Sequence, residues 1–129
     1  WHQSSLVPYD ASRISARYAQ QLAPDTLFTV NGEFQSTNYY DENDMANDTT
    51  LSANISRRLN DVSTLTARLI YLNDRDRLFG NSQGLEEDLE LSVQYRKFDL
   101  YANLRNSFLN SDSDRSTFQT IEFGIRRSF

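Results

Sequence analysis

Apolar and polar residues alternate along one stretch of the chain after another, which is the pattern of a β-strand with two unlike faces. The last stretch, residues 117–129, shows the alternation most plainly. Ile121, Phe123 and Ile125 fall on one parity, whereas Glu122 belongs to the other, polar parity. Side chains two residues apart point to the same face of a strand. This segment is therefore predicted to be a strand with one apolar face and one charged face.

Six earlier segments alternate in the same way, so we predict an all-β fold of about seven antiparallel strands. Leu22–Thr26 contains Pro24 and Asp25, which favour a tight turn between the first two strands. The predicted strands cover residues 13–19, 27–40, 50–59, 64–72, 89–96, 98–105 and 117–129.

The predicted connections alternate in length. Those after the first, third and fifth strands are short turns, whereas residues 41–49, 73–88 and 109–116 form longer polar loops with many acidic residues. Short periplasmic turns and longer extracellular loops are typical of outer-membrane barrels. We therefore predict an antiparallel up-and-down transmembrane β-barrel.

Strand direction indicates how much of a barrel this sequence covers. If the last strand ends in the periplasm, the first also runs inward and Trp1 starts outside. Complete single-chain bacterial barrels have an even number of strands and begin in the periplasm. We therefore interpret residues 1–10 as an extracellular loop remnant and residues 11–129 as the C-terminal part of a larger transmembrane barrel. The alternative is a missed strand at Leu6–Tyr9.

Composition excludes several other classes. No run of about 18 apolar residues is present, which excludes a transmembrane helix. A mean hydropathy of -0.66 remains compatible with a barrel, because barrel strands turn only every second residue to lipid. Cysteine is absent, which excludes disulfides and thiolate metal sites. The net charge of -5 and the scattered basic residues argue against nucleic-acid binding.

The end of the chain resembles the C-terminal assembly signal of Gram-negative outer-membrane barrels. Glu122, Gly124 and the final Phe129 match this signal, and Arg127 departs from the hydrophobic residue usual at its position. The resemblance implies recognition by the barrel assembly machinery.

The hairpins from Arg13 onward resemble outer-membrane β-barrel porins, including those found with exopolysaccharide export systems. The resemblance lies in the strands L-E-L-S-V-Q-Y-R and F-D-L-Y-A-N-L-R and in the ending G-I-R-R-S-F. Barrels that sheathe multihaem cytochromes look similar at this level. The resemblance implies the cell outer membrane of a Gram-negative bacterium, contact with its lipid, and a pore or sheath for transport. A cytochrome or an exopolysaccharide export component would be the periplasmic or lumenal partner.

Charged side chains gather on the polar parity, where they are expected to line the lumen and pair across neighbouring strands. Such a wall could select solutes by charge or brace a wide pore. The alternative is that a wet interior merely tolerates charge. The lumen-lining candidates are Arg17, Glu33, Arg58, Arg68, Glu90, Arg96, Asp99, Arg105, Glu122 and Arg126.

Aromatic residues on the apolar parity cluster near the predicted turns, as in the aromatic girdles of membrane barrels. The alternative is the ordinary preference of aromatic residues for strands. The predicted periplasmic girdle contains Tyr18, Phe28, Tyr95, Phe98 and Phe129, and the opposite girdle contains Tyr40, Tyr71 and Phe108.

Sequence motifs for metal binding and catalysis are weak. Oxygen ligands suited to Ca²⁺ occur in the acidic loop, but without the spacing or glycine of an EF-hand, so a solvated loop is favoured and no metal or cofactor is expected. The single histidine, His2, lies in an unpatterned segment, and we expect no enzymatic activity. The acidic loop contains Asp41, Glu42, Asn43, Asp44, Asn47 and Asp48.

Two alternatives to a pore remain open. The first is a soluble secreted β-sandwich or solenoid that binds a partner or a glycan, in which the apolar parity would form a dry core. The second is a small outer-membrane hydrolase, which would need His2 or a histidine outside this sequence. The environment of the apolar face distinguishes a barrel from a sandwich.

Overall fold

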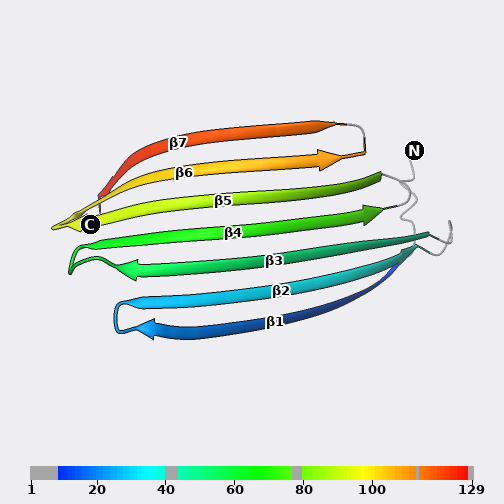
Figure 1. Cartoon of the computed structure of the whole chain (residues 1–129), viewed down its shortest axis with the longest axis horizontal. Helices are drawn as coiled ribbons and strands as arrows, with labels where there is room; N and C mark the ends of the chain where they lie inside the picture. Colours follow the sequence, from blue (N-terminus) through cyan, green and yellow to red (C-terminus); the bar gives the residue numbers. More distant parts are fainter. Residues whose placement is uncertain (1–8, 40–43, 77–79, 113, 128–129) are drawn as a thin grey trace, which may run out of the picture.

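The computed structural model describes residues 9–39, 44–76, 80–112 and 114–127, which form one antiparallel sheet (Figure 1). Each strand pairs with its neighbours in the sequence, in the order β1 to β7. The predicted all-β, up-and-down arrangement of seven strands is therefore confirmed. The strands are β1 (Tyr9–Ala23), β2 (Thr26–Tyr39), β3 (Asp44–Arg58), β4 (Ser63–Asp76), β5 (Gly80–Tyr95), β6 (Phe98–Ser111) and β7 (Arg115–Arg127).

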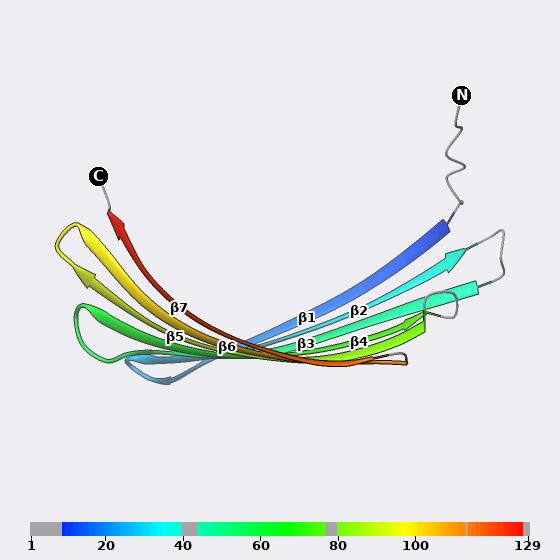
Figure 2. The same ribbon diagram turned by 90° about the horizontal axis from the view of Figure 1, so that it is seen from above.

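The sheet is a single bowed layer (Figure 2). Ala46 is the only buried hydrophobic residue in the described part of the chain. No helix there is long and apolar enough to cross a bilayer. Backbone pairing between neighbouring strands, and not a side-chain core, therefore holds these strands together.

The strands are longer than the alternation predicts. Residues 44–49 belong to β3, residues 73–76 and 80–88 extend β4 and β5, and β6 continues to Ser111. These residues were expected in loops, so those boundaries were wrong. The ladder uses backbone groups only, and it continues where side chains on both faces are polar.

The expected difference in connection length is also wrong. The turns at one end comprise residues 24–25, 59–62 and 96–97, and the strand ends at the other end are separated by similarly few residues. The polar stretches extend the hairpins instead of forming long loops. At the N-terminal side, β1 begins at Tyr9, so Tyr9 and Asp10 pair in a strand and are not part of a loop.

The sheet is open between its first and last strands. β1 pairs only with β2, and β7 pairs only with β6, among the described residues. Closure into a barrel and insertion into a membrane therefore stay predictions. Trp1, His2 and Phe129 lie outside the described residues.

Candidate functional site

The register sorts the side chains into two faces, because directly opposed residues in antiparallel strands point to the same side. One chain of opposed residues runs from Arg17 through Asn31, Ser52 and Glu86 to Phe118. We call this side the polar face. It carries nine of the ten predicted lumen-lining residues: Arg17, Glu33, Arg58, Arg68, Glu90, Asp99, Arg105, Glu122 and Arg126.

Arg96 is the exception. It lies in the turn between β5 and β6 with a φ of 57°, and its guanidinium carbon is 5.4 Å from the centre of the Tyr95 ring. A positive φ breaks the extended backbone, so parity cannot place this side chain on a sheet face.

Arg105 links two carboxylates on the polar face. Its Nε lies 3.5 Å from Oε1 of Glu86, and its Nη2 lies 3.5 Å from Oδ2 of Asp88. Asn103 donates a hydrogen bond of 2.6 Å to Oδ1 of Asp88, and Arg68 is directly opposite Asp88 on β4. Asp88 therefore has an arginine on each neighbouring strand.

Glu86 and Asp88 were missed as candidates because they were assigned to a loop. Both have the parity of Glu90, which was included. Extending the period of β5 by four residues would have found them. A second ion pair on this face joins Nη2 of Arg13 to Oε2 of Glu33 at 2.5 Å, between half-exposed side chains.

A basin of about 560 Å³ lies on the polar face near the turns after β3 and β5. Both acidic and basic side chains line it, so the basin has mixed charge. Four predicted lumen residues are among them, namely Arg58, Glu90, Asp99 and Arg126, together with Tyr101.

Tyr101 connects the two described residues of the predicted assembly signal. Its hydroxyl donates a hydrogen bond of 3.0 Å to Oε1 of Glu122. Its ring lies so close to Gly124, directly opposite on β7, that a Cβ there would overlap the ring. Only glycine leaves room for this packing. The role of these residues in assembly stays a prediction.

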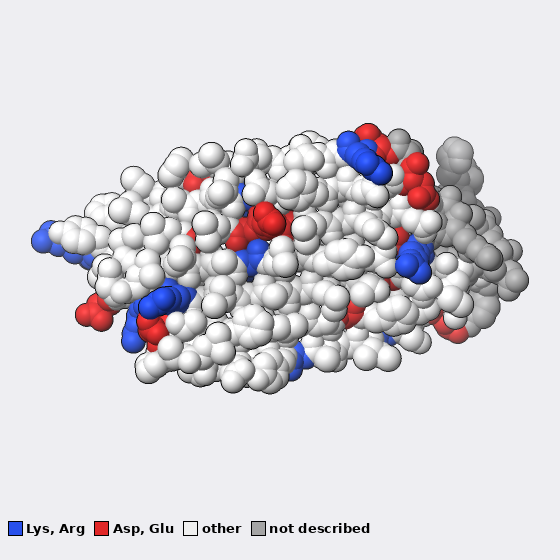
Figure 3. Space-filling view, viewed as in Figure 1, with Lys and Arg blue, Asp and Glu red and all other residues white. Residues whose placement is uncertain are grey.

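The other side of the sheet, which we call the apolar face, exposes large hydrophobic side chains. On β7 the exposed fractions are 63% for Ile121, 76% for Phe123 and 73% for Ile125. Figure 3 shows one face of the sheet, on which most of the surface is neither acidic nor basic. A hydrophobic surface of this extent normally contacts lipid or another polypeptide.

The apolar residues do not run straight across the sheet. Ile14 and Phe34 are in one row with Gln83, Asn110 and Arg115, so this row is apolar on β1 and β2 and polar on β5 to β7. The row nearer the other end is reversed. It begins with Thr26 and Arg57 and continues with Leu65, Leu91, Ala102 and Phe123.

The apolar band therefore crosses the strands at a slant. On β2 it runs from Phe28 to Phe34 and is centred at Asn31, which aligns across the sheet with Phe118. On β7 it is centred five residues later, at Phe123. One residue per strand, at about 3.4 Å along and about 4.8 Å between strands, gives a slant of about 35°.

The predicted girdle residues follow this slant in part. Phe28 on β2 and the opposed pair Tyr95 and Phe98 mark the same margin of the band although they lie in different rows. Tyr71 and Phe108 share one row near the other margin. Tyr18, Phe129 and Tyr40 complete the prediction, and the last two lie outside the described residues.

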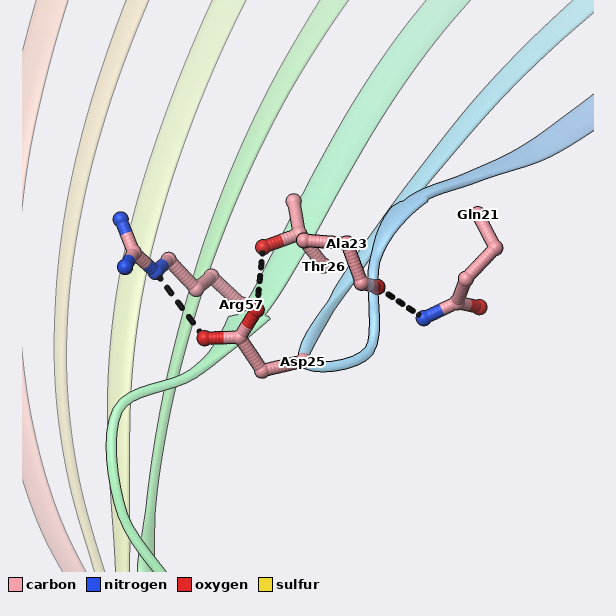
Figure 4. A network of polar contacts seen from close by, with 5 residues as sticks. All are labelled: Gln21, Ala23, Asp25, Thr26 and Arg57. Carbon is pink, nitrogen blue, oxygen red and sulfur yellow. Dashed lines mark hydrogen bonds and ion pairs between the residues drawn. The ribbon is translucent and has the colours of Figure 1, made fainter.

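Polar contacts at the β1–β2 turn tie it to the end of β3 (Figure 4). Thr26 donates a hydrogen bond of 3.1 Å to Oδ1 of Asp25, and Nε of Arg57 lies 3.4 Å from Oδ2. Gln21 donates to the carbonyl of Ala23 at 2.6 Å, beside an irregularity in the β1–β2 ladder. The Thr26 hydroxyl and the Arg57 charge together lower the pKa of Asp25 below its usual value.

Metal ligands are not gathered in the described residues, where no group of three or more acidic or histidine side chains could hold an ion. Asn47 and Asp48 are successive residues of β3 and therefore point to opposite faces. Asp41, Glu42 and Asn43 lie outside the described residues.

Comparison with protein-family models, curated proteins and solved structures returns no match. The functional interpretation therefore depends on the geometry of the two faces.

Proposed function

We propose that this chain is part of an outer-membrane β-barrel whose polar face lines a water-filled pore and whose apolar face contacts lipid. The slanted apolar band carries the proposal. Strands of membrane barrels tilt by about 35–45° from the barrel axis, so a horizontal lipid layer crosses them at this slant. The band on this sheet crosses at about 35°. On the apolar face, Arg57, Arg75 and Arg115 lie beyond the margins of the band. The carboxylate of Glu87 lies within it.

The bow of the sheet agrees with this orientation. Thr29, Thr37 and Ala46, three of the most buried described residues, belong to the polar face. Side chains crowd together on the concave side of a curved sheet, so the burial of these residues indicates that the polar face is the concave face. The polar face would then point towards the lumen, and the hydrophobic residues of the convex side towards lipid.

Closure of this sheet into an antiparallel barrel would require further strands. β1 and β7 run in the same direction, because six antiparallel steps separate them. Direct pairing of these edges would be parallel, so an odd number of further strands must lie between β7 and β1. We infer that these seven strands are part of a larger barrel. Outer-membrane lipid and the assembly machinery are its proposed partners.

A pore with this lining would transport hydrophilic solutes or sheathe a lumenal partner. The charges of Arg68, Asp88 and Arg105 would act on permeating ions at short range. A soluble β-sandwich is the alternative, and it would require a second layer over the apolar face.

Nitroxide labels test the slant directly, because these 129 residues contain no cysteine and an introduced cysteine is the only one among them. Single labels replace Phe34 and Gln83, which share one row, and Phe123 and Arg57, which share another. Each labelled protein is reconstituted in vesicles. Relaxation by dissolved oxygen, which concentrates in lipid, is then compared with relaxation by a water-soluble nickel complex.

Labels at Phe34 and Phe123 are expected to respond to oxygen, and those at Gln83 and Arg57 to nickel. Equal responses within each row would contradict a lipid layer crossing the sheet at a slant. Protection of Phe34 and Phe123 from both agents would favour the dry core of a soluble sandwich.

A further inference from the structure

Three polar residues interrupt the apolar band. On β5 the interruption lies between the centre of the band and the start of the strand at Gly80. Glu87, Asn106 and Gln119 are opposed neighbours on β5, β6 and β7, and they belong to the apolar face. We call these three residues the polar notch. Apolar side chains flank it on β5 and β6, with Leu85 and Leu89 on either side of Glu87 and with Leu104 and Phe108 on either side of Asn106. A carboxylate in an apolar band is costly unless a partner offsets its charge.

Within the sheet, Glu87 has little compensation. Asn106 donates a hydrogen bond of 3.4 Å to its Oε2, which is a long contact. The residue directly opposite on β4 is Leu69, and the neighbours on the same face among the described residues include no basic side chain. Glu87 is exposed, so its carboxylate is open to an external group.

A shallow hollow of about 410 Å³ adjoins the notch. Its apolar lining combines the small side chains of Ala53 and Ala67 with larger neighbours such as Phe28 and Ile55, while Glu87 and Asn106 supply polar groups. Asn54, Arg68 and Asp88 also border the hollow, but the register places their side chains on the polar face. The short alanine side chains leave the space that the larger residues enclose. The hollow is therefore apolar along most of its length, and one part of its wall carries negative charge.

We propose that the hollow and the polar notch bind an amphiphile with an ammonium group, its alkyl chain against Ala53 and Ala67 and its amine against Glu87. The charge of the amine complements the carboxylate, and Asn106 orients that carboxylate. A free amphiphilic amine and the headgroup of an amine-bearing lipid share this chemistry. The site exists in the sheet itself, so the proposal does not depend on the pore.

Photo-crosslinking tests the site. The full chain, folded in maltoside micelles, is exposed to a dodecylammonium probe that carries a diazirine in its alkyl chain, and to the matching dodecanol probe. Crosslinks are mapped by peptide mass spectrometry. The variants are Glu87→Gln, which removes the charge, and Glu90→Gln, which removes a charge from the polar face of the same strand.

The ammonium probe is expected to label the segments that contain Ala53 and Ala67. Glu87→Gln should reduce this labelling about fivefold and leave the dodecanol labelling unchanged, while Glu90→Gln should change neither. Equal labelling of the native chain by both probes, or an undiminished ammonium signal in Glu87→Gln, would overturn the proposal. Circular dichroism verifies that each variant retains its strands.

Lipid competition distinguishes the two sources of the amine. If a membrane lipid occupies the site, the amine headgroup of phosphatidylethanolamine should compete with the ammonium probe. Labelling should then be lower in nanodiscs of phosphatidylethanolamine than in nanodiscs of phosphatidylglycerol. Equal labelling in the two lipids, still dependent on Glu87, assigns the site to a free amphiphile. Failure of the nitroxide experiment would refute the pore and leave this assay in micelles unaffected.

Discussion

The ring of Tyr101 covers Gly124 on the adjacent strand, and its hydroxyl reaches Glu122 two residues away. The aromatic ring fills space that the glycine leaves free. It also shields backbone that would otherwise be exposed in the edge strand β7. The last two described strands are therefore joined by side-chain packing as well as by their backbone ladder.

Replacement of Gly124 by alanine is expected to destabilise the β6–β7 hairpin, because the new methyl group would overlap the Tyr101 ring. Overpacking of this kind costs about 1–3 kcal/mol of unfolding free energy. Urea unfolding in micelles measures the loss. Gly32→Ala is the matched control, because a Cβ there would meet only the end of the flexible Leu51 side chain. Additive losses in the double variant Gly124→Ala/Tyr101→Ala would contradict a shared contact.

Neutralisation of Arg105 is expected to make the pore more cation-selective. Arg105→Gln leaves Glu86 and Asp88 without their shared cation, so the lining gains net negative charge. The reversal potential across a planar bilayer under a salt gradient measures the selectivity. Arg115→Gln, on the apolar face, removes the same charge and should leave the potential unchanged. A potential in Arg105→Gln identical to that of the native protein would exclude this residue from the pore lining.

Acid is expected to weaken the β1–β2 turn through Asp25. Its folded pKa is lower than the ordinary value of 3.8. The contacts with Thr26 and Arg57 therefore stabilise the fold above about pH 4, and this contribution is lost as the pH falls through the lowered folded pKa. Unfolding curves between pH 6 and pH 2, compared with those of Asp25→Asn, isolate the effect.

Thr26→Val tests the main cause of the Asp25 shift, because it removes the hydroxyl and preserves the shape of the side chain. It should bring the folded pKa of Asp25 closer to the ordinary value and reduce the acid-dependent loss of stability. An unchanged loss would mean that the Thr26 hydrogen bond does not stabilise the carboxylate.

A charge in the middle of the slanted band should prevent insertion into lipid. Ala102 is within the band on β6, and Ala102→Arg is expected to cost about 2–4 kcal/mol of insertion free energy if it is near the bilayer midplane. Asn103→Arg places the same side chain on the polar face and should be tolerated. Equal folding yields of the two variants into vesicles would contradict a lipid-facing apolar band.

Local alternation was sufficient to predict the number of strands and the membership of the two faces. The period of two is a property of the extended backbone, so counting along β6 assigns Leu100 and Asp99 to opposite faces without any partner strand. Alternation failed at the strand ends. Asn81 pairs with Arg75 in the ladder, and Asp74 pairs with Ser82, although the side chains on both faces there are polar. The alternation of hydropathy is then uninformative.

The sequence by itself determined that seven segments form strands with an apolar and a polar parity, because side-chain direction depends only on position along the strand. Only the tertiary structure decided which residues are neighbours. Strand register aligned Arg57 with Phe123 and thereby made the apolar band slanted. It also brought Tyr101 over Gly124 and Glu87 beside Asn106. These contacts are between strands, and a shift of register by two residues would preserve every parity while changing every pair.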